Sequence, residues 1–174
     1  MTYGEIQMIE YWDLYDKNRE KLGRTHERGK PLEEGTYHIA VNVWIVNSKG
    51  EVLLAKRHPQ KKIYGGMWEC SASGSIYAGE DSHDGAIRET YEEIGLELER
   101  SELILIESIR RKDDFRDSFI VRKDIDIKEV KIQPEEVIDI KWARKEEYEK
   151  MVELEVVAPP TTNFYTLYNI EKDE

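Results

Sequence analysis

The residues from Ser82 to Ile94 predict a helix that is better defined than any other segment of this 174-residue chain. Ser82 is a favourable N-cap, and Gly95 stands just past the last turn, where a glycine commonly ends a helix. On a helical wheel of about 100° per residue, Tyr91 and Ile94 lie within about 40° of Ile87. We therefore expect one apolar side of this helix to pack against the rest of the fold.

The opposite side of the same helix carries carboxylates. Glu89, Glu92 and Glu93 lie at roughly 140° to 240° from Ile87, with Arg88 at one edge. Neighbouring carboxylates repel one another, and a hard divalent cation such as Mg²⁺, which takes oxygen ligands, removes that repulsion. Glu89 and Glu93 are i and i+4 neighbours and are therefore close enough to share one ion. A metal site and a solvated acidic face are the two interpretations of this pattern.

Strand and turn patterns on both sides of the helix predict a mixed sheet. The expected strands are a pair around a turn within 9–28, and single strands at 37–47, 51–56, 68–73, 102–110, 117–121 and 137–142. Further helices are expected at 145–152 and 161–170. The predicted fold class is α/β, with helices covering a mixed β-sheet that follows a short N-terminal β-hairpin. The charged loop at 29–35 suggests a division into a hairpin extension, residues 1–30, and a main domain, residues 31–174.

The charge balance limits the class of partner. The chain has 26 Lys and Arg against 37 Asp and Glu, a net charge of −11, which argues against binding to nucleic-acid polymers and to anionic membranes. A small anionic substrate stays open, because a bound divalent cation reverses the local sign of a site. No apolar run reaches about eighteen residues, no secretory signal stands at the start, and Cys70 is the only cysteine. We therefore expect a cytoplasmic protein of one domain, as a monomer or a homodimer.

The loop before the helix and the helix itself share a longer motif. Counting from Gly74, five residues lead to Glu80, and seven more lead to Arg88. The pattern resembles the Nudix box, G-x5-E-x7-R-E-U-x-E-E-x-G-U, in which U is a bulky aliphatic residue. Its invariant positions are filled by Gly74, Glu80, Arg88, Glu89, Glu92, Glu93 and Gly95. Leu96 fills the last U position, whereas Thr90 departs from the first, which we interpret as a variation in packing.

The resemblance to the Nudix family implies an α/β/α sandwich, with residues 31–174 as a Nudix hydrolase domain. It also implies hydrolysis of a diphosphate bond in a small substrate, such as a nucleoside diphosphate linked to another group, with Mg²⁺ or Mn²⁺ as cofactor. By the family pattern, the metal ligands would be Glu89, Glu93, Glu92 (directly or through water) and the backbone carbonyl of Ser73. Glu80 and Arg88 would orient the ligand carboxylates through charge-assisted bonds.

Two further groups of residues are candidates for this site. The basic residues before and after the box that could bind substrate phosphates are Arg57, Lys62 and Arg111. The general base is either a box glutamate or an acid on a later loop, and the later acids considered are Asp114, Asp117, Glu135 and Glu136. For every one of these residues, an ordinary solvated loop side chain is the alternative.

The stretch from 14 to 80 also resembles the branch of the family related to isopentenyl-diphosphate isomerase, which shares the fold. That isomerase needs a cysteine before the loop glycine and a histidine after it, where this chain has Ser73 and Ser75. A hydroxyl does not replace a thiol in proton transfer at carbon, and Cys70 lies three residues too early. Hydrolysis is therefore favoured over isomerisation. A non-catalytic binding module with this fold is a third hypothesis, and the complete set of box glutamates argues against it.

Overall fold

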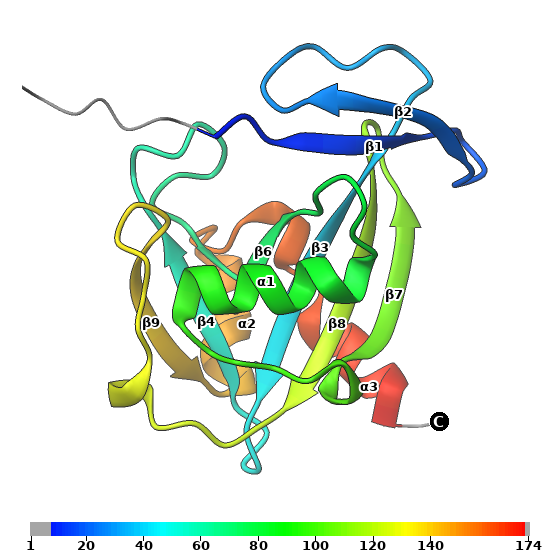
Figure 1. Ribbon diagram of the computed structural model, residues 1–174. Helices are drawn as coiled ribbons and strands as arrows, with labels where there is room; N and C mark the ends of the chain where they lie inside the picture. The colour runs from blue at the N-terminus through cyan, green and yellow to red at the C-terminus, as the bar shows by residue number, and fades with distance from the viewer. Residues whose placement is uncertain (1–7, 173–174) are drawn as a thin grey trace, which may run out of the picture.

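The computed structural model describes residues 8–172, which form a mixed seven-stranded sheet, a separate hairpin and three α-helices (Figure 1). The strands of the sheet are β3 (His38–Val46), β4 (Val52–Arg57), β5 (Trp68–Glu69), β6 (Ala72–Ser75), β7 (Ile104–Arg110), β8 (Asp114–Arg122) and β9 (Val137–Ala143). The helices are α1 (Ser82–Ile94), α2 (Lys145–Glu153) and α3 (Phe164–Lys172). No helix in this described part has both the length and the apolarity needed to cross a membrane.

The strands run in the order β5-β4-β3-β8-β7, with β6 paired to β3 and β9 paired to β4. The neighbours β3 and β8 are parallel, while the other pairs of the sheet are antiparallel. This mixed sheet confirms the predicted fold class. Because β3 has partners on both sides, it places the residues of β6 and β8 at fixed positions along one central strand.

The central strand β3 is buried along its whole length because helices cover both faces of the sheet. Successive side chains of a strand point to opposite faces. Val41, Val43 and Ile45 belong to one core cluster, together with residues of α1. Trp44 and Val46 belong to a second cluster, together with residues of α2 and α3. In Figure 1, α1 lies on one face of the sheet and α2 and α3 lie on the other, which is the predicted α/β/α sandwich.

The predicted N-terminal hairpin is present and is fastened to the sandwich. It consists of antiparallel strands β1 (Tyr11–Tyr15) and β2 (Lys21–Glu27), and β2 is largely exposed. The backbones of Tyr15 and Tyr37 exchange two hydrogen bonds of 2.8 and 2.9 Å. Arg19, at the turn, donates to both carboxylate oxygens of Asp117 on β8, at 2.8 and 2.5 Å. The division of the chain at residue 30 stays a prediction, and residues 1–7 lie outside the described part.

Several element boundaries differ from the prediction for local reasons. Two 3₁₀ turns, Arg100–Glu102 and Pro159–Thr161, delay the starts of β7 and α3. The single strand predicted before the box is split into β5 and β6. The strand predicted at 117–121 is longer at both ends, so Asp114 is the first residue of β8 instead of lying in the loop before it.

Helix α1 has the predicted bounds, but its N-cap and its buried side differ from the prediction. The N-cap is Asp81 and not Ser82, because Oδ1 of Asp81 accepts from the N–H of Asp84 at 2.9 Å, and the Asp84 carboxylate accepts from the Asp81 N–H at 3.1 Å. Gly95 ends the helix as predicted, with φ 68°. Tyr91 is 56% exposed, so the prediction that it packs against the fold is wrong.

Helix α1 packs on the sheet side through small residues, and this explains the outward position of Tyr91. Gly85, Ala86 and Thr90 are buried. A Cβ on Gly85 would lie only 2.3 Å from Cγ2 of Ile76, so the two backbones approach closely at this point. The Thr90 hydroxyl donates to the carbonyl of Ala86 at 2.7 Å, which satisfies its polar group inside the core. The departure of Thr90 from the aliphatic pattern is thus accommodated by the helix's own backbone.

Candidate active site

Strand β6 and helix α1 meet where Gly74 faces Glu89. A Cβ on Gly74 would lie 2.1 Å from Cδ of Glu89 and 2.2 Å from its Oε1, closer than real contacts allow. The glycine of the motif is therefore required for space, so that the Glu89 carboxylate can lie against the strand. Gly79 serves the turn instead, because it has a φ of 88°, in the left-handed region that favours glycine.

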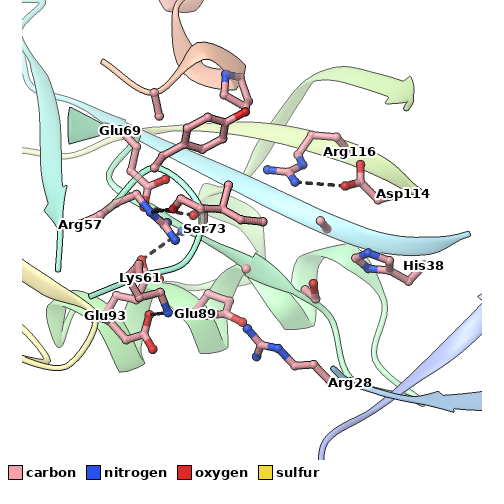
Figure 2. A pocket seen from close by; sticks show the side chains of 18 of the residues that line it. Arg28, His38, Arg57, Lys61, Glu69, Ser73, Glu89, Glu93, Asp114 and Arg116 are labelled. Carbon is pink, nitrogen blue, oxygen red and sulfur yellow. Dashed lines mark hydrogen bonds and ion pairs between the residues drawn. The ribbon is translucent and has the colours of Figure 1, made fainter. Parts of the chain in front are cut away.

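A cavity of about 680 Å³ lies beside this contact (Figure 2). One side is formed by Glu89, Glu92 and Glu93 from α1 and by Ser73 from β6. Basic residues enter from the hairpin, from the end of β4 with the loop after it, and from the β7–β8 region: they are Arg28, Arg57, Lys61, Lys62, Arg111 and Arg116. The cavity therefore combines a carboxylate side with cations from several other segments, an arrangement that suits an anionic ligand bound together with a metal ion.

Arg88 connects the box residues to one another. Its Nε and Nη2 donate to the two carboxylate oxygens of Glu80 at 2.8 and 3.0 Å. Its Nη1 donates to Oε1 of Glu89 at 2.9 Å and to Oε2 of Glu92 at 3.1 Å. Burial raises the pKa of Glu80, but the bonds from Arg88 and from the Tyr77 N–H outweigh burial and lower that pKa overall. Arg88 therefore lies between Glu80, which stays ionised, and two of the residues predicted as metal ligands.

Glu93 and Glu69 place two buried carboxylates close to Ser73. Oε2 of Glu93 accepts from the Ser73 N–H at 3.1 Å, and Oε1 of Glu69 accepts from Arg57 at 2.6 Å. Burial, together with the charges of Glu69 and Glu89, raises the pKa of Glu93 well above its usual value. Burial also raises the pKa of Glu89 to about 7 in spite of Arg88. Burial and mutual repulsion therefore disfavour the ionised forms of these carboxylates.

The donor chemistry at this point fits a hard divalent cation. The carboxylates of Glu89, Glu92 and Glu93 and the backbone carbonyl of Ser73 offer the oxygen ligands that Mg²⁺ and Mn²⁺ take. Across residues 8–172, no three Asp, Glu, His or Cys side chains stand as a preformed metal cage. Arg88 bonds one oxygen of Glu89 and one of Glu92, and each carboxylate has a second oxygen. A cation here would favour the ionised forms that burial disfavours.

The three basic residues predicted to bind substrate, Arg57, Lys62 and Arg111, all line the cavity. Arg57 donates to Glu69 and, at 3.1 Å, to the carbonyl of Ile63, which holds its guanidinium at the end of β4. Nε of Arg111 lies 3.7 Å from Oδ1 of Asp114. The structure thus brings the three cations to one place, and their role in binding stays a prediction.

The four acids considered as general base separate into two groups. Asp114 and Glu136 line the cavity, whereas Asp117 and Glu135 are not part of its lining. Glu136 forms an ion pair with Lys61. Asp114 accepts from Nη2 of Arg116 at 3.2 Å. Asp117 is instead bound by the hairpin at Arg19, as described above.

Several residues of the cavity have no counterpart in the sequence analysis. They are Trp12, Arg28, Glu69 and Arg116. Glu69 carries a weak signal, since it is the one charged residue in the segment 68–73. Trp12 and Arg28 come from the hairpin, and no local pattern reveals that the hairpin borders the cavity. Trp12 stacks on His38 with ring centroids 3.9 Å apart.

The residues flanking Gly74 bring hydroxyls and no thiol to the cavity. Ser73 and Ser75 line it. Cys70 is fully buried, is not among the described lining residues, and donates from Sγ to the carbonyl of Ala72 at 3.2 Å. Burial raises the pKa of the Cys70 thiol well above its usual value. Cys70 is therefore not placed to transfer protons in this cavity.

Comparison with known proteins identifies the relatives of this fold. The family model of the NUDIX domain matches residues 36–164. An uncharacterised Nudix hydrolase of Listeria monocytogenes is 37% identical over 143 residues, which cover 82% of this chain and 85% of that protein. An isopentenyl-diphosphate Delta-isomerase of Paenarthrobacter aurescens is 32% identical over 92 residues, 53% of this chain and 50% of that enzyme. The crystal structure of DR0079 from Deinococcus radiodurans has the same fold, with a TM-score of 0.73 at 20% identity over 91% of this chain and 96% of that one.

Proposed function

Because this chain belongs to the Nudix hydrolase family, we propose that it uses a divalent metal ion to hydrolyse a diphosphate bond in a small molecule. The substrate class we favour is a nucleoside diphosphate linked to another group, with Mg²⁺ or Mn²⁺ as the metal. One observation carries this proposal: the buried carboxylates of Glu89 and Glu93 share a cavity with basic residues from other segments. A diphosphate bound through a metal ion requires both kinds of group in the same place.

We assign the metal to Glu89 and Glu93, with Glu92 binding directly or through water and the Ser73 carbonyl as a further ligand. A bound Mg²⁺ neutralises phosphate charge and makes a water molecule a stronger nucleophile. The chain prepares these ligands in advance, because Arg88 fixes Glu89 and the Ser73 N–H fixes Glu93. Glu80 in turn fixes Arg88, so the two act as positioning residues.

Arg57, Lys62 and Arg111 are the proposed contacts to phosphate oxygens. An arginine guanidinium can bond two oxygens of one phosphate, whereas a lysine acts as a point charge. Arg57 ends β4, Lys62 lies in the loop after it, and Arg111 lies between β7 and β8. Positive charge therefore reaches the cavity from two separate regions of the fold.

We propose Glu136 as the group that takes the proton of the attacking water. Glu136 lines the cavity, and its negative charge contributes to the raised pKa of Glu93, which supports a position close to the proposed ligands. Asp114 lines the cavity too, but it is paired with two cations, Arg111 and Arg116, whereas Glu136 is paired with Lys61 alone among the described residues. In this step the water oxygen bonds to phosphorus, the bond from phosphorus to the bridging oxygen breaks, and the proton passes to the carboxylate. A box glutamate is the alternative acceptor.

Isomerisation of isopentenyl diphosphate is the second candidate function, favoured by the similarity to an isopentenyl-diphosphate isomerase. The residues that flank Gly74 oppose it, since both are serines and the one cysteine is buried elsewhere. A non-catalytic binding module is opposed by the presence of Glu89, Glu92 and Glu93 at one cavity.

The test is a screen of nucleoside diphosphate and triphosphate derivatives and isopentenyl diphosphate with Mg²⁺ or Mn²⁺, followed by phosphorus NMR. We expect cleavage of at least one diphosphate bond that requires the metal. The Glu93→Gln variant keeps the side-chain shape but removes its charge, so we expect turnover to fall by about 100-fold or more with the fold intact. Turnover by Glu93→Gln equal to that of wild type would refute the assignment of Glu93 as a metal ligand. Deuterium exchange into isopentenyl diphosphate would favour the isomerase instead.

A further inference from the structure

Arg28 lies immediately after β2 and lines the cavity from the hairpin. Its backbone N–H donates to the carbonyl of Glu10 at 2.9 Å, which holds the end of the hairpin closed. Figure 2 shows its side chain directed toward Glu89, from the side away from Arg57 and Lys61. A cation therefore approaches the carboxylate side of the cavity from a segment that lies outside the Nudix box.

The guanidinium of Arg28 is held by one carboxylate, that of Glu10. The other oxygen of Glu10 accepts from the Tyr77 hydroxyl at 3.1 Å, so the pair is connected to the loop between β6 and α1. Burial lowers the pKa of Arg28, but the bond to Glu10 and the charges of Glu10, Glu89 and Glu136 outweigh burial and raise that pKa overall. Arg28 is thus fixed in position and close to the proposed metal ligands.

Some N–H donors of the Arg28 guanidinium remain available to a ligand. Among the described residues, only Nη1 has a side-chain partner, Glu10, and the side chain is 47% exposed. Arg116 differs, because Nη1 donates to Asn42 at 3.0 Å and Nη2 donates to Asp114 at 3.2 Å. A guanidinium has further N–H groups in a fork that matches phosphate oxygens. Arg28 therefore combines a fixed position with unused donors that face the cavity.

We propose that Arg28 binds a non-bridging oxygen of the substrate's diphosphate, so that the N-terminal hairpin forms one wall of the substrate site. This inference rests on the proposed function and adds a residue from outside the box. A diphosphate carries charge on both phosphorus centres. A metal ion on the α1 carboxylates neutralises part of that charge, and Arg28 neutralises more from another side, while Glu10 acts as its positioning residue.

The chain offers a matched control for this proposal on the same hairpin. Arg24 lies on β2 and pairs with Glu33 at 2.6 Å, with both side chains more than half exposed. Arg24 is not among the described residues that line the cavity. Arg24→Ala therefore removes the same charge from the same hairpin without altering the cavity.

The experiment measures binding of methylenediphosphonate, a diphosphate that cannot be hydrolysed, in the presence of Mg²⁺ by calorimetry. We expect Arg28→Ala to weaken this binding by about 10- to 100-fold, as for the loss of a charged hydrogen bond. Arg28→Lys should recover part of the affinity, because it keeps the charge but loses the fork. Arg24→Ala should bind like wild type. Mn²⁺ binding to the free protein should be no weaker in any variant than in wild type, and the unfolding midpoint should be the same in all of them.

Each contrary result has a distinct meaning. Equal binding by Arg28→Ala and Arg24→Ala would overturn the role of Arg28, while metal-dependent hydrolysis by wild type would leave the proposed function standing. Weaker Mn²⁺ binding in Arg28→Ala without phosphonate would also overturn the role, because Arg28 would then act through the metal ligands. Absence of both hydrolysis and phosphonate binding in wild type would overturn the proposed function together with this inference.

Discussion

Replacing Gly74 with alanine tests whether the position of the Glu89 carboxylate controls activity. The new Cβ would lie 2.1 Å from Cδ of Glu89, and to restore an ordinary contact of about 3.4 Å the carboxylate would have to move by about 1.3 Å. The atoms in the way belong to the end of a flexible side chain, so Glu89 moves in preference to the backbone of β6. The substitution therefore displaces a proposed metal ligand and leaves the fold in place.

The expected magnitudes follow from that displacement. A misplacement of about 1 Å at a reacting site can cost about 100-fold in rate. We therefore expect kcat/KM of Gly74→Ala to fall by about 100-fold. The free energy of unfolding should change by about 1 kcal/mol or less, because no core side chain is removed or compressed.

Gly85→Ala is the matched control, since its Cβ would meet Cγ2 of Ile76 at 2.3 Å, in the core and away from the carboxylates. Overpacking of this kind costs about 1–3 kcal/mol. The assay compares kcat/KM at saturating Mg²⁺ with urea unfolding for both variants. We expect Gly74→Ala to lose activity more than stability, and Gly85→Ala to lose stability more than activity. Wild-type kcat/KM in Gly74→Ala would refute the reasoning, because the Glu89 position would then not matter.

Three further predictions concern single side chains. Arg88→Lys keeps the charge but loses the two-pronged bond to Glu80. A Mg²⁺ titration of activity should therefore show a loss of about 10- to 100-fold in Mg²⁺ affinity or in turnover. A titration curve equal to that of wild type would mean that Arg88 is only a surface charge. Glu136→Gln should lower kcat by about 100-fold or more and leave KM and Mg²⁺ binding unchanged, and a wild-type kcat would exclude Glu136 as the base. Burial raises the pKa of Asp117, but the bonds from Arg19 and Ser108 outweigh burial and hold it below 3.8. Asp117→Asn should therefore lower the free energy of unfolding by about 2 kcal/mol at pH 7. Measured by urea unfolding, this difference from wild type should shrink as the pH falls below 3.8, because the wild-type carboxylate is then protonated. A difference that stays constant with pH would contradict the pairing.

Features set by local spacing could be predicted from the sequence. A helix fixes the direction of each side chain, so the i and i+4 positions of Glu89 and Glu93 place both at the same cavity. The bond between Arg88 and Glu80 follows from the same short-range geometry. The helix stop at Gly95 needs only the left-handed backbone that glycine adopts easily.

Features set by packing between distant segments could not be predicted. A wheel ranks the sides of α1 by hydrophobicity, but the contact of Gly85 with Ile76 sets the rotation that leaves Tyr91 exposed. The prediction also expects Glu93 on the side away from the fold, yet it is buried, because β6 lies beside that part of the helix. Arg28 gives no local signal at all, since its place at the cavity depends on how the hairpin docks.

The walls of the cavity differ in the free energy that local opening of their backbone requires. Strand β3 is buried and bonded on both sides, whereas β2 is largely exposed. The contacts that fasten the hairpin, such as the bridge between Tyr15 and Tyr37, are made by β1 and by the turn. Segments with few buried contacts open at a lower free energy than the core, and their amide hydrogens exchange faster. Strand β2 can therefore open locally, while Leu14 and Tyr15 of β1 stay buried against the sandwich. Amides of β2 should therefore exchange with solvent well before those of β3.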